Sequence, residues 1–191
     1  MSRTVLAATW FDESRDPSTL VDAAYVFGGT HLLRSFFGHA SAKPANGRLL
    51  LVTPFIDANL LAHLSPFQDE HARKTDLVLL TTPGEARSSA LARIAQLPWR
   101  RCEIRSLRGL HAKLYVSLQD GRTPKALIGS HNLTAAGAFS NIEVGVLLSG
   151  VNHESQQIIG SLIDHVLELR AASTAVYDSL SWPPSSSVAA A

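Results

Sequence analysis

The sequence is poor in cysteine, and this shortage excludes several classes of protein. Cys102 is the only cysteine in the 191 residues. A single thiol cannot form an intramolecular disulfide, and it rules out every zinc motif that is built on a cysteine cluster. Because chains without disulfides are typical of reducing compartments, we expect a cytoplasmic protein.

The sequence also lacks an excess of charge and of aromatic residues. Lys plus Arg number 17 and Asp plus Glu number 16, which leaves a formal net charge of +1. No field over the whole molecule therefore attracts nucleic acid, a membrane or an acidic ligand, and a site for a charged ligand must be local. Aromatic residues make up 7% of the chain, which is too few for an extended surface on which bases stack.

Long apolar runs are absent as well. No segment approaches the roughly 18 uninterrupted apolar residues that a membrane-spanning helix needs. The amino-terminal stretch is interrupted by Asp12, Glu13 and Asp16, unlike the apolar core of a signal peptide. We therefore expect no contact with a membrane. No internal repeat is visible either, so we expect no second copy of any motif in this sequence.

Apolar residues nevertheless make up 46% of the chain, which is enough for one domain with a core. Two independent domains would be a tight fit at this length. We assign residues 1–178 to a single domain. Residues 179–191 combine two prolines with repeated Ser and Ala, and this composition predicts a disordered tail.

Strands and helices alternate in the hydrophobic pattern. Apolar runs of strand length are bounded by Gly, Pro and polar residues. They predict strands at 47–55, 76–83, 102–107, around His111, at 125–132 and at 141–150. Helical spacing predicts helices at 58–72, 84–98 and 153–173, and a helix or broken pair of helices at 19–40. We expect Asp57 to cap the helix at 58–72 and Pro66 to end or kink it. The alternation predicts an α/β fold, an α-β-α sandwich around a central mixed sheet.

A predicted hairpin follows residue 110. Asp120-Gly121 is a strong turn signal between two strand-like runs. A two-residue loop at Gly121 and Arg122 would close the hairpin. The remaining residues are then paired by counting outwards from that loop.

This register places His111 opposite Asn132 and Lys113 opposite Ser130. All four side chains then project from one face, because side chains alternate along a strand. A shift of one residue would separate the two pairs. Glu143 has the same parity as His111, so its carboxylate is a candidate partner for one imidazole nitrogen.

These residues resemble the signature of the phospholipase D superfamily. That signature is His-x-Lys, then Gly-Ser-x-Asn, and about a dozen residues later an acidic residue; the matches here are His111-Ala112-Lys113, Gly129-Ser130-His131-Asn132 and Glu143. The resemblance covers residues 47–150. It implies a phospholipase D-like fold.

One position departs from the fuller family motif. That motif has Asp seven residues after the His, where this chain has Leu118, with Asp120 two places later in the turn. Alternation directs Leu118 away from the His111 face, so a proton carrier need not be lost. The departure makes the chain look more like nuclease and restriction-type relatives than like the lipid-cleaving members.

The resemblance implies a reaction. One His attacks the phosphorus of a phosphodiester and a second His protonates the leaving oxygen, after which water hydrolyses the phosphohistidine. Lys113 would supply positive charge. Ser130 and Asn132 would donate hydrogen bonds to phosphate oxygens or hold the Lys and His, and Glu143 would fix the tautomer of His111. No metal or other cofactor is implied.

The reaction needs two histidines, and family members with one motif form a homodimer with the active site on the two-fold axis. The resemblance therefore implies a symmetric dimer in which each copy supplies His111. His131 also lies within the motif, but alternation turns it away from Ser130, which favours a role in packing or in a loop.

A basic run precedes His111, and we expect Arg105 and Arg108 to contact substrate phosphates. The resulting hypothesis is a metal-independent phosphodiesterase, a homodimeric nuclease that cleaves DNA or RNA. By resemblance it would serve a restriction or defence system, with a partner such as a helicase. The alternatives are a phospholipid phosphodiesterase and a non-catalytic protein for nucleic-acid binding or assembly.

Overall fold

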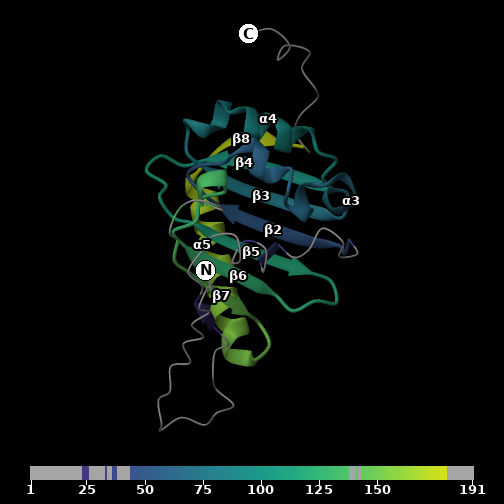
Figure 1. The fold of residues 1–191 in the computed structure, drawn as a ribbon, viewed down its shortest axis with the longest axis vertical. Coiled ribbons are helices and arrows are strands. Elements are labelled where there is room, and N and C mark those ends of the chain that lie inside the picture. The colour runs from purple at the N-terminus through teal and green to yellow at the C-terminus, as the bar shows by residue number, and fades with distance from the viewer. Residues whose placement is uncertain are drawn as a thin grey trace, which may run out of the picture.

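A central sheet forms the middle layer of the protein (Figure 1). The structure, a computed structural model, describes residues 23–25, 33, 36–37, 44–137, 141 and 143–179. Eight strands follow the order β1-β7-β6-β5-β2-β3-β4-β8. Their bounds are Ala23–Tyr25 (β1), Gly47–Val52 (β2), Thr75–Thr81 (β3), Arg101–Ser106 (β4), Leu114–Gln119 (β5), Lys125–Gly129 (β6), Gly145–Ser149 (β7) and Thr174–Asp178 (β8).

The sheet is mixed, as the sequence predicts. β3 pairs in parallel with both β2 and β4, whereas the remaining neighbours are antiparallel. The parallel pairs are joined by helical crossovers, and the antiparallel ones follow where the predicted strands are closely spaced. The predicted α/β fold is thus confirmed.

Helices cover both faces of the sheet. One face packs against the short helices α2 (Ala58–Leu61) and α3 (Asp69–Ala72) and against α4 (Ser89–Gln96). The other face packs against the long helix α5 (His153–Ala172), which buries Ile159 and Val166. Alternate residues of the strands supply the two cores, as period-two patterning requires. In β5, Tyr115 belongs to the α4 side and Leu114 to the α5 side.

The prediction of a helix at 19–40 is wrong for residues 23–25. These form β1, which pairs antiparallel with β7 and extends the sheet at that side. The spacing of apolar residues does not show whether a distant strand has an unpaired edge. A short segment can pair with such an edge even where its own spacing is helical. Leu33, Phe36 and Phe37 are helical and buried. The rest of 19–40 lies outside the described residues.

Two other elements differ from the prediction. Asp57 caps α2 by accepting a hydrogen bond from the backbone N–H of Asn59, as predicted. The helix predicted at 58–72 ends at Leu61, however, and Pro66 lies in a 3-10 turn before α3.

Strand β8 was not predicted; it follows α5 and pairs with β4. Of the predicted disordered tail, only Ser179 lies within the described residues, and its backbone N–H donates to the carbonyl of Cys102.

The strand directions bring the sequence motifs to one end of the sheet. β2 and β6 end there, and β5 and β7 begin there. We call this the motif end. Within the described ranges, no helix is both long and apolar enough to cross a membrane.

Candidate active site

The β5–β6 hairpin has a different register from the predicted one. Leu114 lies opposite Ile128, and the backbone N–H of Gly129 donates to the carbonyl of Lys113 at 3.2 Å. Lys113 therefore pairs with Gly129 and not with Ser130, so the predicted register is wrong by one residue.

The turn accounts for the shift. Gly121 has a φ of 68°, and the backbone N–H of Arg122 donates to the carbonyl of Gln119 at 3.0 Å. Thr123 and Pro124 then extend the connection before β6 begins. Because proline has no N–H to donate to the ladder, the connection is longer than the predicted two-residue loop.

His111 and Lys113 precede β5 and do not belong to the strand. The His111 side chain is exposed and Lys113 is half-buried. The Lys113 ammonium donates to the carbonyl of His111 at 2.9 Å. Ser130 is exposed and Asn132 half-buried, and both follow the end of β6. The residues meet at the motif end because both segments leave the sheet there, rather than through alternation along paired strands.

Glu143 is the buried acidic residue of the site, with 4% of its surface exposed. The Ser130 hydroxyl donates to Oε2 of Glu143, and the side-chain amide of Asn141 donates to Oε1 at 3.1 Å. The Ser130 oxygen also accepts from the backbone N–H of Val144 at 3.1 Å. The structure thus gives the carboxylate two partners that the sequence analysis did not predict.

His131 lies inside the protein, with 0% of its surface exposed. The hydroxyl of Tyr115 donates to the carbonyl of His131 at 2.6 Å. In the part of the chain that the structure describes, neither ring nitrogen of His131 has a hydrogen-bond partner. Burial lowers the pKa of His131, while the nearby Glu143 acts in the opposite direction. A fully buried imidazole agrees with the predicted packing role.

Gly129 is required by the close approach of β7. A Cβ at this position would lie 2.5 Å from the carbonyl oxygen of Val144 and 2.8 Å from Cα of Gly145. It would also lie 3.0 Å from Nδ1 of His131. The glycine of the Gly-Ser-x-Asn motif therefore has a packing reason in addition to any functional one.

The segment after β2 is a part of the site that the sequence analysis did not single out. Ile56 forms an isolated parallel bridge with Leu133. The Thr53 hydroxyl donates to the carbonyl of Phe55 at 3.0 Å and accepts from the backbone N–H of Leu133 at 3.4 Å. The available signal was the run Pro54-Phe55-Ile56-Asp57 directly after a buried strand, which lies within the stretch that resembles the family.

The two predicted substrate-binding arginines have different surroundings. Arg105 donates to the hydroxyl of Ser173 at 2.7 Å, to its carbonyl at 2.6 Å and to Glu103 at 3.0 Å. Glu103 is buried and also binds Arg170. Arg108 is exposed in the turn that leads to His111. The structure therefore uses the donors of Arg105 to join β4 to the end of α5, and it leaves Arg108 at the surface.

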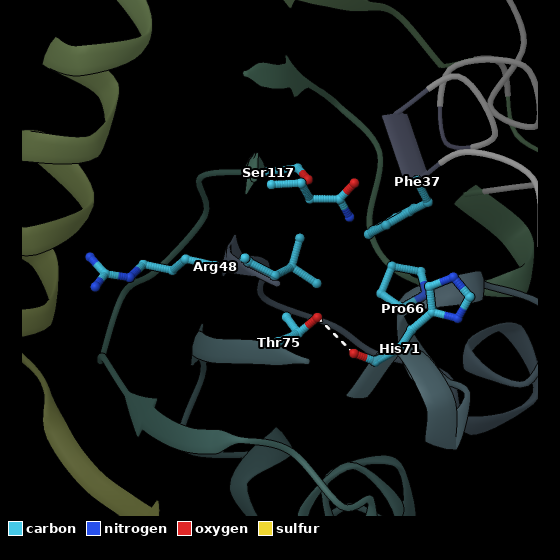
Figure 2. A pocket seen from close by; sticks show the side chains of 9 residues that line it. Phe37, Arg48, Pro66, His71, Thr75 and Ser117 are labelled. Carbon is cyan, nitrogen blue, oxygen red and sulfur yellow. Dashed lines mark hydrogen bonds between the residues drawn. The ribbon is translucent and has the colours of Figure 1, made fainter. Parts of the chain in front are cut away.

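Among the described residues, three cavities are found at the end of the sheet remote from the motifs. The smallest, of about 10 Å³, is lined by Phe37, Pro66, His71 and other residues; Figure 2 shows the Arg48 side chain extending away from these three. Two larger cavities, of about 280 and 150 Å³, share Arg48 and Asp76. Arg100 binds Asp76, and this contact lowers the pKa of the Asp76 carboxyl. None of these three cavities is lined by a motif residue.

Within residues 44–137 and 143–179 and the other described positions, no group of three or more His, Cys, Asp or Glu side chains is placed to hold a metal ion.

The mixed sheet, the two helical layers and the position of the motif segments define the fold of the phospholipase D family. Nuc from Salmonella typhimurium, a phospholipase D family member, is similar with a TM-score of 0.56 and 18% identity, over 80% of this chain and 97% of Nuc. NucT from Helicobacter pylori is similar with a TM-score of 0.59 and 12% identity, over 80% of this chain and 98% of NucT.

TrmBL2, an archaeal chromatin protein with a novel mode of DNA binding, is also similar, with a TM-score of 0.50 and 14% identity. The likeness covers 86% of this chain and 56% of TrmBL2. No family model matches the sequence, and no curated protein matches it. The similarity to the solved structures confirms the phospholipase D-like fold that the motifs imply.

Proposed function

We propose that the protein is a metal-independent phosphodiesterase that cleaves nucleic acid, with His111 as the nucleophile. The observation that carries this proposal is the exposed His111 with the half-buried Lys113 beside Ser130 and Asn132, at the motif end of a phospholipase D-like fold. An imidazole at the surface can approach a phosphorus atom. A neighbouring ammonium stabilises the negative charge that develops on the phosphoryl oxygens.

The hydrogen bonds of the motif residues suggest a different role for each. One N–H of the Lys113 ammonium is used by the carbonyl of His111, which leaves two for phosphate oxygens. Oδ1 of Asn132 is buried, and within the described residues it has no hydrogen-bond partner. A buried acceptor suits the positioning of a protonated Lys or His. The Ser130 hydroxyl is engaged by Glu143, which supports a positioning role for both of them.

The proposed reaction has two steps. In the first, a nitrogen of His111 forms a bond to phosphorus, the bond to the leaving oxygen breaks, and a second imidazole gives that oxygen a proton. In the second, water attacks phosphorus, the P–N bond breaks, and the proton of the water returns to the second imidazole. We propose that the second imidazole is His111 of another copy of the chain, in a two-fold homodimer.

Nucleic acid is the proposed substrate class. The support is the exposed Arg108, three residues before His111 in the sequence, and the likeness of the fold to Nuc and NucT. A second candidate function, DNA binding without cleavage, is favoured by the likeness to TrmBL2. A place in a restriction or defence system, with a helicase or similar partner, is proposed from the motif resemblance alone.

The test is incubation of the purified protein with labelled single- and double-stranded DNA and RNA in excess EDTA. We expect cleavage, and an acid-labile phosphohistidine adduct on rapid quenching. His111→Ala should abolish both and leave the dimer intact, whereas His63→Ala, which removes another exposed imidazole, should change neither. Binding without cleavage by the unsubstituted protein would select the second candidate. Full activity of a monomer at micromolar concentration would contradict the shared site.

A further inference from the structure

Phe55 is an exposed aromatic side chain at the motif end. Its exposed fraction is 49%, and Ile128 and Val144, which are also exposed, lie at the same end of the sheet. Among the exposed large apolar residues that the structure describes, Phe55 is the aromatic one. An exposed aromatic ring keeps apolar surface in water, which burial would make favourable. Its place therefore invites a functional reason.

The backbone around Phe55 is held firmly. The carbonyl of Phe55 accepts from the Thr53 hydroxyl, and the hydroxyls of Thr81 and Thr82 donate to the carbonyl of Pro54 at 3.3 and 3.0 Å. On the other side, the backbone N–H of Asp57 donates to the carbonyl of Leu133 at 2.7 Å. The ring thus stands on a fixed support, and binding to it requires little ordering of the backbone.

The same support places Phe55 beside the Gly-Ser-x-Asn motif. Ile56 and Leu133 form a parallel bridge, so the preceding residues, Phe55 and Asn132, are neighbours on the two segments. Ile56 and Leu133 are buried, whereas Phe55 is exposed and Asn132 is half-buried. An exposed aromatic side chain therefore lies next to the Gly-Ser-x-Asn motif, to which the proposed function gives a place beside the phosphate.

We propose that Phe55 stacks on the nucleobase next to the scissile phosphate, so that the enzyme prefers single-stranded nucleic acid or frayed duplex ends. This inference rests on the proposed function and names the substrate class. Stacking accepts any base, since each has a flat π face. In an intact duplex the base is already stacked and paired, and freeing it costs a few kcal/mol. One fixed ring serves this purpose without the extended aromatic surface that the composition excludes.

The experiment compares two single-stranded oligonucleotides of the same sequence, one intact and one with an abasic position next to the cleaved phosphate. For the intact strand, Phe55→Leu should lower kcat/KM by about 5- to 100-fold, the range expected for loss of one base–aromatic contact. For the abasic strand, the same substitution should change kcat/KM less than about 2-fold. Phe55→Trp should retain the activity on the intact strand. Val151→Ala, at an exposed apolar residue between β7 and α5, is the matched control.

The outcomes separate this inference from the proposed function. Equal losses on the intact and abasic strands, or no loss on either, would overturn the stacking role while cleavage itself stands. A shift from dimer to monomer in Phe55→Leu would assign the ring to the contact with a second copy instead. If the unsubstituted protein cleaves nothing, the proposed function fails. In that case the affinities of the unsubstituted and Phe55→Leu proteins for the intact and abasic strands are compared. A loss of affinity in Phe55→Leu that is confined to the intact strand supports stacking, and the same affinity change for both strands overturns it.

Discussion

The hydroxyl of Ser130 donates a hydrogen bond to the buried carboxylate of Glu143, across the gap between the end of β6 and the start of β7. Asn141 binds the second carboxylate oxygen. Because both oxygens are engaged, the acidic residue of the motif holds the Gly-Ser-x-Asn segment in place. The geometry thus connects two of the three motif parts by a contact that spacing alone did not predict.

Substitution Glu143→Gln tests this contact. Ser130 and Asn141 donate to different carboxylate oxygens, and in Gln one of these positions becomes an NH2 donor, so one of the two donors loses its acceptor. We expect the free energy of unfolding in urea to fall by about 1–3 kcal/mol, and kcat/KM to fall because Ser130 and Asn132 lose their support. Glu70→Gln, at an exposed residue, removes the same charge and should be neutral. Unchanged stability with a shifted pH–rate profile would instead indicate His111 as the carboxylate's partner.

Substitution Gly129→Ala tests the close approach of β6 and β7. The added Cβ would meet backbone atoms of Val144 and Gly145 at 2.5 and 2.8 Å, which a strand cannot relieve by rotating a side chain. We expect a loss of about 2 kcal/mol or more in the free energy of unfolding, together with a loss of activity. Gly160→Ala in α5 meets nothing within 4 Å and should stabilise the protein by up to about 1 kcal/mol. Equal effects of the two substitutions would contradict the packing argument.

Substitution Tyr115→Phe tests the link between the core and the motif. It leaves the ring in place but removes the donor to the buried carbonyl of His131. An unsatisfied buried acceptor costs about 1–3 kcal/mol, which a shift of the urea midpoint would report. Tyr177→Phe is the control, because that hydroxyl donates to the carbonyl of Ala95 at a longer distance, 3.3 Å, in a half-buried position. A larger effect at Tyr177 than at Tyr115 would count against the link.

The lowered pKa of His131 predicts a loss of stability in acid. The unfolded chain binds a proton at His131 as the pH falls through about 6.5, whereas the folded protein takes it up only at lower pH, since burial lowers the pKa. This contribution is therefore fully present above about pH 6.5 and declines as the pH falls towards the folded pKa. His131→Leu should weaken the fall in unfolding free energy between pH 7.5 and about 5, measured in urea. An equally steep fall in the variant would refute the assignment.

Arg105 and Arg108 should separate stability from substrate affinity. Arg105→Gln leaves the buried Glu103 with Arg170 alone, and we expect a loss of about 2–4 kcal/mol in unfolding free energy with unchanged affinity for single-stranded DNA. Arg108→Gln should leave stability within about 0.5 kcal/mol but weaken binding and reduce the salt dependence of log K by about 0.7. Fluorescence anisotropy over a series of salt concentrations measures the affinity and its salt dependence, and unfolding in urea measures the stability. A reduced salt dependence in Arg105→Gln would instead indicate that Arg105 contacts substrate phosphates.

The sequence by itself determined the features that depend on local chemistry. The apolar runs predicted β2, β3 and β4, and helical spacing predicted α5, which packs Ile158, Leu162, Val166 and Leu169 against the sheet. These signals are local because burial of a strand or helix face is written into every second or every third to fourth residue. The motif residues were also recognisable, since the chemistry depends on their types and order.

The tertiary structure decided what depends on long-range pairing. Whether Lys113 faces Gly129 or Ser130 is set by the length of the β5–β6 turn, and one residue reverses the answer. The strands at Ala23–Tyr25 and Thr174–Asp178 exist because β7 and β4 offer edges to pair with. Phe55 lies beside Asn132 only because Ile56 bridges to Leu133, far away along the chain. Such contacts leave no periodic trace in a single sequence, so only the folded chain reveals them.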